Sequence, residues 1–144
     1  MIWEEYSNFK DKGDLEDSGI LIVDDDNNNL ELLRHFFRVE GFGVTSASNA
    51  DEALALLKVS RFSFLLTDYI MPGKNGLELA EEALGILPDL KIIMITGNSS
   101  AQLSNRAATS GIRDVLVKPI NFKDLSRIMV AENTQTITNV VPAT

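Results

Sequence analysis

The chain has 144 residues, a length that suits one domain, and its apolar share of 44% is enough for a buried core. Thirteen basic and 21 acidic side chains give a net charge of −8, which argues against binding to nucleic acid or to an anionic membrane surface. Cysteine is absent, which excludes disulfides and thiolate metal sites, and the single histidine excludes a site of histidines alone. The sequence has neither an apolar run that could span a membrane nor an N-terminal signal peptide, so we expect a cytoplasmic protein.

The first 18 residues are polar and acidic, and they differ from the rest of the chain. We expect them to form a flexible extension, although Trp3, Tyr6 and Phe9 also have the spacing of one face of a short helix. From residue 19 onward, short apolar runs typical of buried strands alternate with stretches of helical periodicity. The predicted strands are residues 20–23, 44–47, 62–67, 91–95 and 114–117. The predicted helices are residues 27–39, 49–59, 77–84, about 99–110 and 121–131, and a polar tail covers residues 132–144.

Capping signals support several of these helices. Asn49 and Glu52 have the spacing of a capping box, in which each side chain binds a main-chain amide of the other. Either Ser99 or Ser100 can cap the fourth predicted helix, and Asn121 can cap the fifth.

The regular alternation of strands and helices predicts an α/β fold over residues 19–131. Strands that alternate with helices over short connections favour a parallel sheet, and right-handed crossovers place helices on both of its faces. We therefore expect one domain with a doubly wound, five-stranded parallel sheet, flanked by the extension and the tail.

Polar residues interrupt this pattern where predicted strands end. Asp24 and Asp25 follow the first strand, Asp68 the third, Thr96 the fourth and Lys118 the fifth. The carboxyl ends of parallel strands share one edge of the sheet, where ligands bind, so we expect these side chains to meet. Three carboxylates repel one another unless a cation neutralises them, and hard oxygen ligands favour Mg²⁺. A carboxylate nucleophile with a metal, an ammonium and a hydroxyl donor matches phosphorylation of an aspartate.

Four stretches together resemble the receiver domain of two-component response regulators: ILIVDDD (20–26), LLTDYIMPGKNGLEL (65–79), IIMITG (92–97) and VLVKPI (115–120). The resemblance implies a flavodoxin-like sheet of the receiver type. It also implies a phosphoryl group received from a histidine kinase or phosphotransfer protein, with Mg²⁺, or Mn²⁺ in its place. By the same resemblance Asp68 is the phosphoacceptor, and Asp24, Asp25, Asp68 and the main-chain carbonyl of Ile70 are the metal ligands.

The resemblance also assigns roles around the phosphoryl group. Thr96 is similar to the family's switch hydroxyl, Lys118 to its invariant lysine, and Gly97 leaves room beside them. Ile70 and Asn98 stand at the two positions where, in the family, side chains position or block the water that hydrolyses the phosphoaspartate. A downstream partner, or a second copy of the chain, is expected at the face made by the fourth predicted helix, the fifth strand and the fifth helix. Val115 stands on that strand where the family often has an aromatic residue.

Other interpretations of the same residues carry less weight. Asp24-Asp25-Asp26 after an apolar strand also resembles the nucleophile motif of haloacid-dehalogenase-type phosphatases, but the acids that such an enzyme needs after Lys118 are limited to Asp124 and Glu132. His35 lies within a predicted helix, where we expect a surface or packing role. We therefore expect a signalling domain rather than an enzyme. The cognate kinase, the output and the possibility of a larger parent protein stay open.

Overall fold

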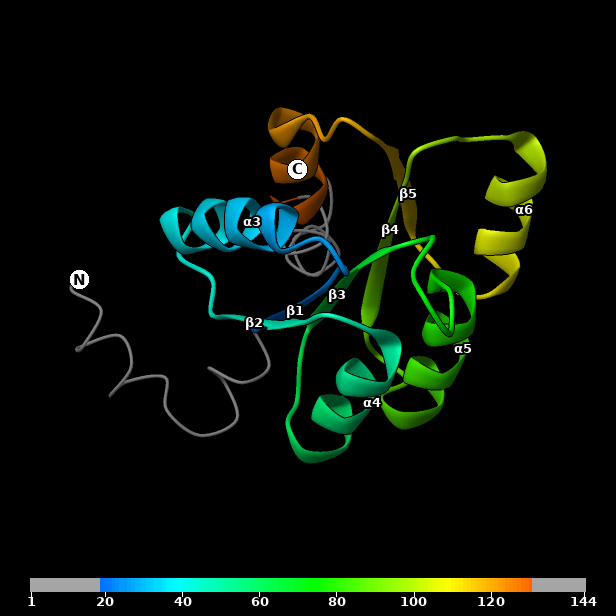
Figure 1. Cartoon of the computed structure of the whole chain (residues 1–144), viewed down its shortest axis with the longest axis horizontal. Coiled ribbons are helices and arrows are strands. Elements are labelled where there is room, and N and C mark those ends of the chain that lie inside the picture. The colour runs from blue at the N-terminus through cyan, green and yellow to red at the C-terminus, as the bar shows by residue number, and fades with distance from the viewer. Residues whose placement is uncertain (1–18, 131–144) are drawn as a thin grey trace, which may run out of the picture.

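The computed structural model describes residues 19–130, so the predicted extension (1–18), the last predicted helical residue and the tail (131–144) lie outside the described residues. Figure 1 shows strands that alternate with helices along the chain. The strands are β1 (Ile20–Val23), β2 (Val44–Ala47), β3 (Phe64–Asp68), β4 (Lys91–Thr96) and β5 (Asp114–Val117). The helices are α3 (Asn27–Val39), α4 (Ala50–Val59), α5 (Gly76–Ile86), α6 (Ala101–Thr109) and a last one at residues 122–130, orange in Figure 1.

All five strands belong to one parallel sheet with the order β2-β1-β3-β4-β5. The chain runs from β1 outward to β2, crosses back to β3 and then continues to the other edge. The direction of winding therefore reverses between β1 and β3, and such a switch point is where open α/β sheets bind ligands. The predicted α/β class and the doubly wound sheet are confirmed.

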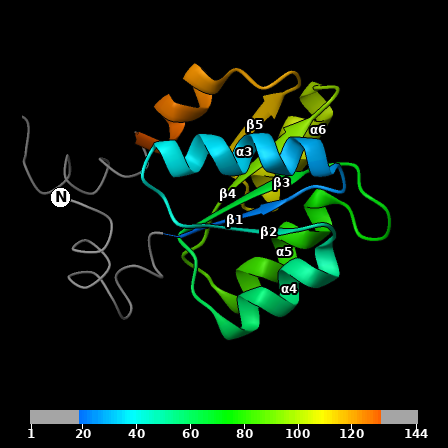
Figure 2. The ribbon, with the colours of Figure 1, turned by 60° about the vertical axis from the view of Figure 1, so that its left-hand side comes forward.

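Helices cover both faces of the sheet, as Figure 2 shows for α3 on one side and α4 and α5 on the other. The cause is the alternation of side chains along each buried strand. Leu21 and Val23 of β1 pack with α4, α5 and α6, whereas Ile20 and Ile22 pack with α3 and the helix at residues 122–130. The strands β1, β3 and β4 are buried on both faces, which explains why they read as continuous apolar runs.

The predicted capping box on α4 is only half present. The Asn49 side chain accepts a hydrogen bond from the Glu52 amide at 2.8 Å, but the Glu52 carboxylate accepts from the Ser48 amide instead of the Asn49 amide. A complete capping box occurs at α5, between Asn75 and Glu78. The sequence reasoning placed the start of that helix one residue late and did not identify the box.

Two further predictions needed correction. The third strand begins at Phe64, two residues later than predicted, because the Ser63 and Phe64 amides both bond the Gly19 carbonyl at the edge of the ladder. On α4 the buried leucines are Leu54 and Leu57, although helical spacing from Ala53 also predicts an inward position for Leu56, which is only partly buried.

Candidate functional site

Three carboxylates converge at the carboxyl end of the sheet. Asp24 directly follows β1, and Asp68 is the last residue of β3. Because the register of these strands pairs Val23 with Thr67, Asp24 and Asp68 come to lie side by side. Asp24, Asp25 and Asp68 each offer a carboxylate oxygen, and these oxygens lie within 4.8 Å of one another. Asp24 and Asp68 are 5% and 7% exposed, whereas Asp25 is open to solvent.

The Asp24 carboxylate accepts hydrogen bonds on both of its oxygens. The main-chain amide of Asp26 binds one at 3.0 Å, and the side-chain amide of Asn29, in the first turn of α3, binds the other at 3.2 Å. Burial raises the pKa of Asp24 above its usual value, and the nearby charge of Asp68 adds to that rise; the two hydrogen bonds and Lys118 oppose it. The sequence reasoning assigned Asn29 no role, because its contact with Asp24 bridges a turn whose geometry a motif does not reveal.

Lys118 supplies a positive charge next to Asp68. Its Nζ lies 3.0 Å from Asp68 Oδ1, and its main-chain amide bonds the Thr96 carbonyl at 2.8 Å, which fixes the segment after β5 against β4. Partial burial lowers the pKa of Lys118, but its hydrogen bond with Asp68 and the attraction of the three carboxylates outweigh burial and raise it. The peptide bond between Lys118 and Pro119 is cis.

The Thr96 hydroxyl faces its own loop. Thr96 ends β4 and is 2% exposed; its hydroxyl donates to the Asn98 carbonyl at 2.8 Å and accepts from the Asn98 amide at 3.2 Å. The hydroxyl is therefore already engaged before any phosphoryl group is present. Gly97 and Asn98 are exposed, and a Cβ added at Gly97 would meet nothing within 4 Å among the described residues.

Main-chain hydrogen bonds fix the loop that follows Asp68, both to β4 and between its own two ends. The Tyr69 amide bonds the Ile95 carbonyl and the Gly76 amide bonds the Tyr69 carbonyl, both at 2.8 Å. A Cβ at Gly76 would lie 2.5 Å from the Asp68 carbonyl oxygen, so this close approach requires glycine. Ile70, on the outside of the loop, is 67% exposed.

This donor set fits a divalent cation. Three carboxylates offer hard oxygens within a few ångströms, two of them buried, and their mutual repulsion is only partly balanced by Lys118. Carboxylate oxygens are the ligands that Mg²⁺ takes, with waters and phosphoryl oxygens in its other positions.

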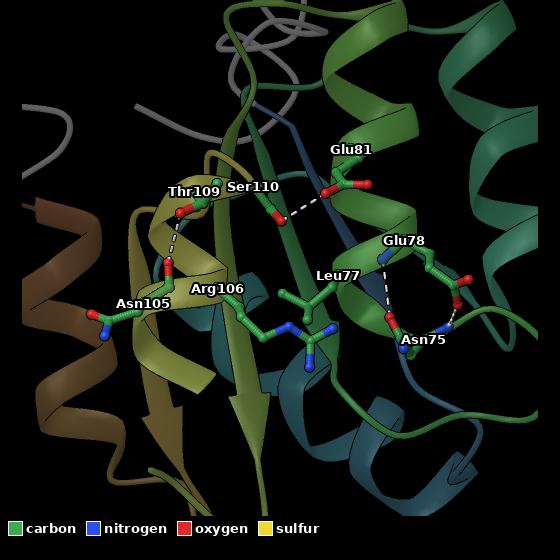
Figure 3. Close-up of a pocket in the computed structure, with 8 residues that line it drawn as sticks. All are labelled: Asn75, Leu77, Glu78, Glu81, Asn105, Arg106, Thr109 and Ser110. Carbon is green, nitrogen blue, oxygen red and sulfur yellow. Dashed lines mark hydrogen bonds between the residues drawn. The ribbon is translucent and has the colours of Figure 1, made fainter. Parts of the chain in front are cut away.

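The surface has a groove next to this site and another that lies apart from it. A groove of about 450 Å³ adjoins it and is lined by Asn29, Leu32, Lys118, Pro119, Ile120 and Phe122. A second groove, of about 400 Å³, lies between α5 and α6 (Figure 3) and contains none of the three clustered carboxylates. Its walls are joined by the Ser110 hydroxyl, which donates to Glu81 at 2.9 Å.

Comparison with known proteins shows the family. The model of the response regulator receiver domain matches residues 20–130, which correspond to nearly all of the described residues. The chain belongs to this family. It is therefore a receiver domain of the kind found in two-component response regulators.

The relatives differ in how much of their length the chain matches. It is 39% identical over 106 residues to the response regulator receiver protein CpdR of Brucella abortus, covering 74% of the chain and 88% of CpdR. It is 32% identical to the C4-dicarboxylate transport transcriptional regulatory protein DctD of Rhizobium meliloti, covering 69% of the chain but only 22% of DctD. The chain thus corresponds to most of one relative and to a fraction of another.

Solved structures agree with this assignment. A CheY-like receiver domain protein from Methanospirillum hungatei has a TM-score of 0.79 at 32% identity, over 85% of this chain and 98% of that one. TrrA from Thermotoga maritima, solved with Mg²⁺ and a beryllium fluoride, has a TM-score of 0.69 at 33% identity, over 76% and 94%. None of these comparisons supports the haloacid-dehalogenase alternative. Within the described residues, no helix is long and apolar enough to cross a membrane.

Proposed function

We propose that Asp68 accepts a phosphoryl group from a histidine kinase or a phosphotransfer protein. The observation that carries this proposal is the position of Asp68, which pairs with Lys118 at 3.0 Å while its carboxylate lies beside Asp24 and Asp25. Lys118 is a fixed point charge that can bind a phosphoryl oxygen as the phosphoryl group moves onto Asp68. No general base is needed, because a carboxylate is already ionised at neutral pH.

The surroundings of the three acids favour Asp68 as the nucleophile. Both oxygens of Asp24 are occupied by hydrogen bonds, and Asp25 lies at the exposed rim. In the transfer, an Asp68 oxygen forms a bond to phosphorus while the bond between phosphorus and the donor nitrogen breaks. The donor nitrogen keeps the electron pair of that bond, and a proton on the other ring nitrogen lets the donor leave as neutral imidazole.

Asp24, Asp25, Asp68 and the main-chain carbonyl of Ile70 would hold a magnesium ion, and Mn²⁺ suits the same oxygen donors. The ion would supply positive charge to the phosphoryl oxygens and to the clustered carboxylates. Lys118 balances part of the remaining charge through its ion pair with Asp68, and Asp24 and Asp68 are themselves buried.

Phosphorylation is expected to change the bonding of Thr96. A phosphoryl group on Asp68 offers its hydroxyl a stronger acceptor than the Asn98 carbonyl that it binds now. The loop at Gly97 and Asn98 and the helix α6 then shift, which alters the face made by α6, β5 and the helix at residues 122–130. A downstream protein or a second copy of the chain would bind this face. Val115 is β-branched and cannot swing a ring, so main-chain shifts would carry the change.

The domain would act as a signalling partner rather than as an enzyme with turnover. Its own chemistry would be limited to accepting the phosphoryl group and losing it to water, with the side chains of Ile70 and Asn98 controlling the approach of that water.

Incubation with acetyl phosphate and Mg²⁺, followed by intact-mass measurement, tests the proposal. We expect one added phosphoryl group on wild type. No group should be added when Mg²⁺ is chelated before the reaction, or to the Asp68→Asn variant. Steady hydrolysis of a phosphomonoester by wild type and by Asp68→Asn alike would instead support the phosphatase alternative with Asp24 as nucleophile.

A further inference from the structure

The Asp24 carboxylate is fixed by two donors of different kinds. The Asp26 donor is a main-chain amide, so it is present whatever side chain stands there. The Asn29 donor is a side-chain amide, and only its residue type provides it. We propose that Asn29 is a positioning residue for the divalent-cation site, which it serves by fixing the orientation of the Asp24 carboxylate; this inference rests on the proposed function of that site.

The local structure places Asn29 where it can do this. Asp26 caps α3 by accepting a hydrogen bond from the Asn28 amide at 2.9 Å, which sets where the helix begins. The third helical residue, Asn29, is half-buried and faces back to the end of β1, while Leu30 in the next position packs into the core. Asn28, one position earlier, is exposed.

The chemistry of the side chain suits the role. A carboxylate with a donor on each oxygen cannot rotate freely, so less of its conformational freedom is lost when it binds a cation. An amide gives this support without charge. A carboxylate at position 29 would add to the repulsion within the cluster, and an ammonium there would compete with the cation for Asp24.

Mg²⁺ titration by calorimetry tests the proposal on the whole chain. The variants are Asn29→Ala, which removes the amide, and Asn29→Leu, which removes the donors but keeps the volume. Asn28→Ala is the matched control, because it makes the same change of residue one position away in the same helical turn. We expect both Asn29 variants to bind Mg²⁺ roughly tenfold more weakly than wild type, the usual cost of losing an outer hydrogen-bond partner. The control should match wild type.

Each other outcome has a definite meaning. Unchanged affinity in Asn29→Ala would overturn the proposal, and so would wild-type affinity in Asn29→Leu, since volume rather than the donor would then matter. Failure of wild type itself to bind Mg²⁺ would instead remove the proposed function on which the inference rests.

A second measurement needs no metal. In NMR spectra of the metal-free protein, Asp24→Ala should shift the side-chain amide signals of Asn29 and leave those of Asn28 in place. Asn29 signals that do not move would show that the contact is absent in solution and would also overturn the proposal.

Discussion

Replacing Asp24 with asparagine should make the metal-free domain more stable. The change removes one buried negative charge and nearly keeps the shape of the side chain. The carbonyl oxygen of the substituted side chain can still accept from the Asp26 amide, and the Asn29 amide can turn over to accept from the new donor, so both hydrogen bonds to this position survive. The main effect of the substitution is to remove the unfavourable free energy of a negative charge that is buried close to other carboxylates.

The size of the effect follows from the separation of the charges. The carboxylate oxygens lie within 4.8 Å of one another, and two unit charges at that upper limit repel by about 3.5 kcal/mol at an effective dielectric constant of ~20. The loss of attraction to Lys118 offsets part of this repulsion, because Lys118 also favours the charged form of Asp24. We expect the free energy of unfolding to rise by about 1–2 kcal/mol, which raises the melting temperature by roughly 4–10 °C for a domain of this size.

The direction of the pKa shift predicts how this gain depends on pH. The folded state raises the pKa of Asp24 above its ordinary value of 3.8, so the folded state binds the proton more tightly than the unfolded state does. Wild type therefore loses stability as the pH rises from 3.8 through the raised pKa, whereas the variant has no such group. The difference between the two proteins should be small in acid and should reach its full size at neutral pH.

Thermal unfolding with a chelator present measures the effect, with Asp26→Asn as the control. Asp26 is exposed, and asparagine caps a helix as well as aspartate does, so the control removes the same charge outside the cluster. Equal melting temperatures for Asp24→Asn and wild type at neutral pH, or a lower one for the variant, would refute the reasoning. Saturating Mg²⁺ should reverse the order, because it stabilises only a protein that binds it.

Three further predictions concern the rest of the site. Gly76→Ala should lower the free energy of unfolding by about 1–3 kcal/mol, measured by denaturant titration, because its Cβ would overlap the Asp68 carbonyl; unchanged stability would contradict the close approach. Ile70→Asn should lose its phosphoryl group roughly 2- to 10-fold faster than wild type, since one hydrogen bond to the attacking water suffices for that gain, and equal decay rates would show that the side chain does not control water. Thr96→Ala should still be phosphorylated, but beryllofluoride should shift fewer NMR signals in residues 97–118 than it does in wild type; an undiminished response would show that this hydroxyl does not transmit the signal.

The sequence was sufficient to predict the fold and the placement of the acids. Apolar runs of strand length identified β1, β3 and β4, because strands buried on both faces carry few polar residues. The position of Asp24 and Asp68 directly after such runs then determined that they meet, since parallel strands bring their carboxyl ends to one edge.

What the sequence did not reveal depends on side-chain rotation and on contacts across turns. Nothing in the motif IIMITG indicates that the Thr96 hydroxyl binds the Asn98 carbonyl, because that bond depends on the path of the loop after β4. The amide of Asn29 reaches Asp24 only because the cap at Asp26 sets where α3 begins. The close approach of Gly76 to Asp68 likewise depends on how the loop folds back.

Mapping the phosphorylated residue in wild type tests the central claim most directly. The protein is treated with acetyl phosphate and Mg²⁺, reduced with borohydride, which converts a phosphoaspartate to homoserine, and then sequenced as peptides by tandem mass spectrometry. The structure predicts homoserine at position 68 alone, where the carboxylate faces Lys118. Homoserine at position 24 or 25, or a phosphoryl group on His35, would contradict the assignment of Asp68 as the phosphoacceptor.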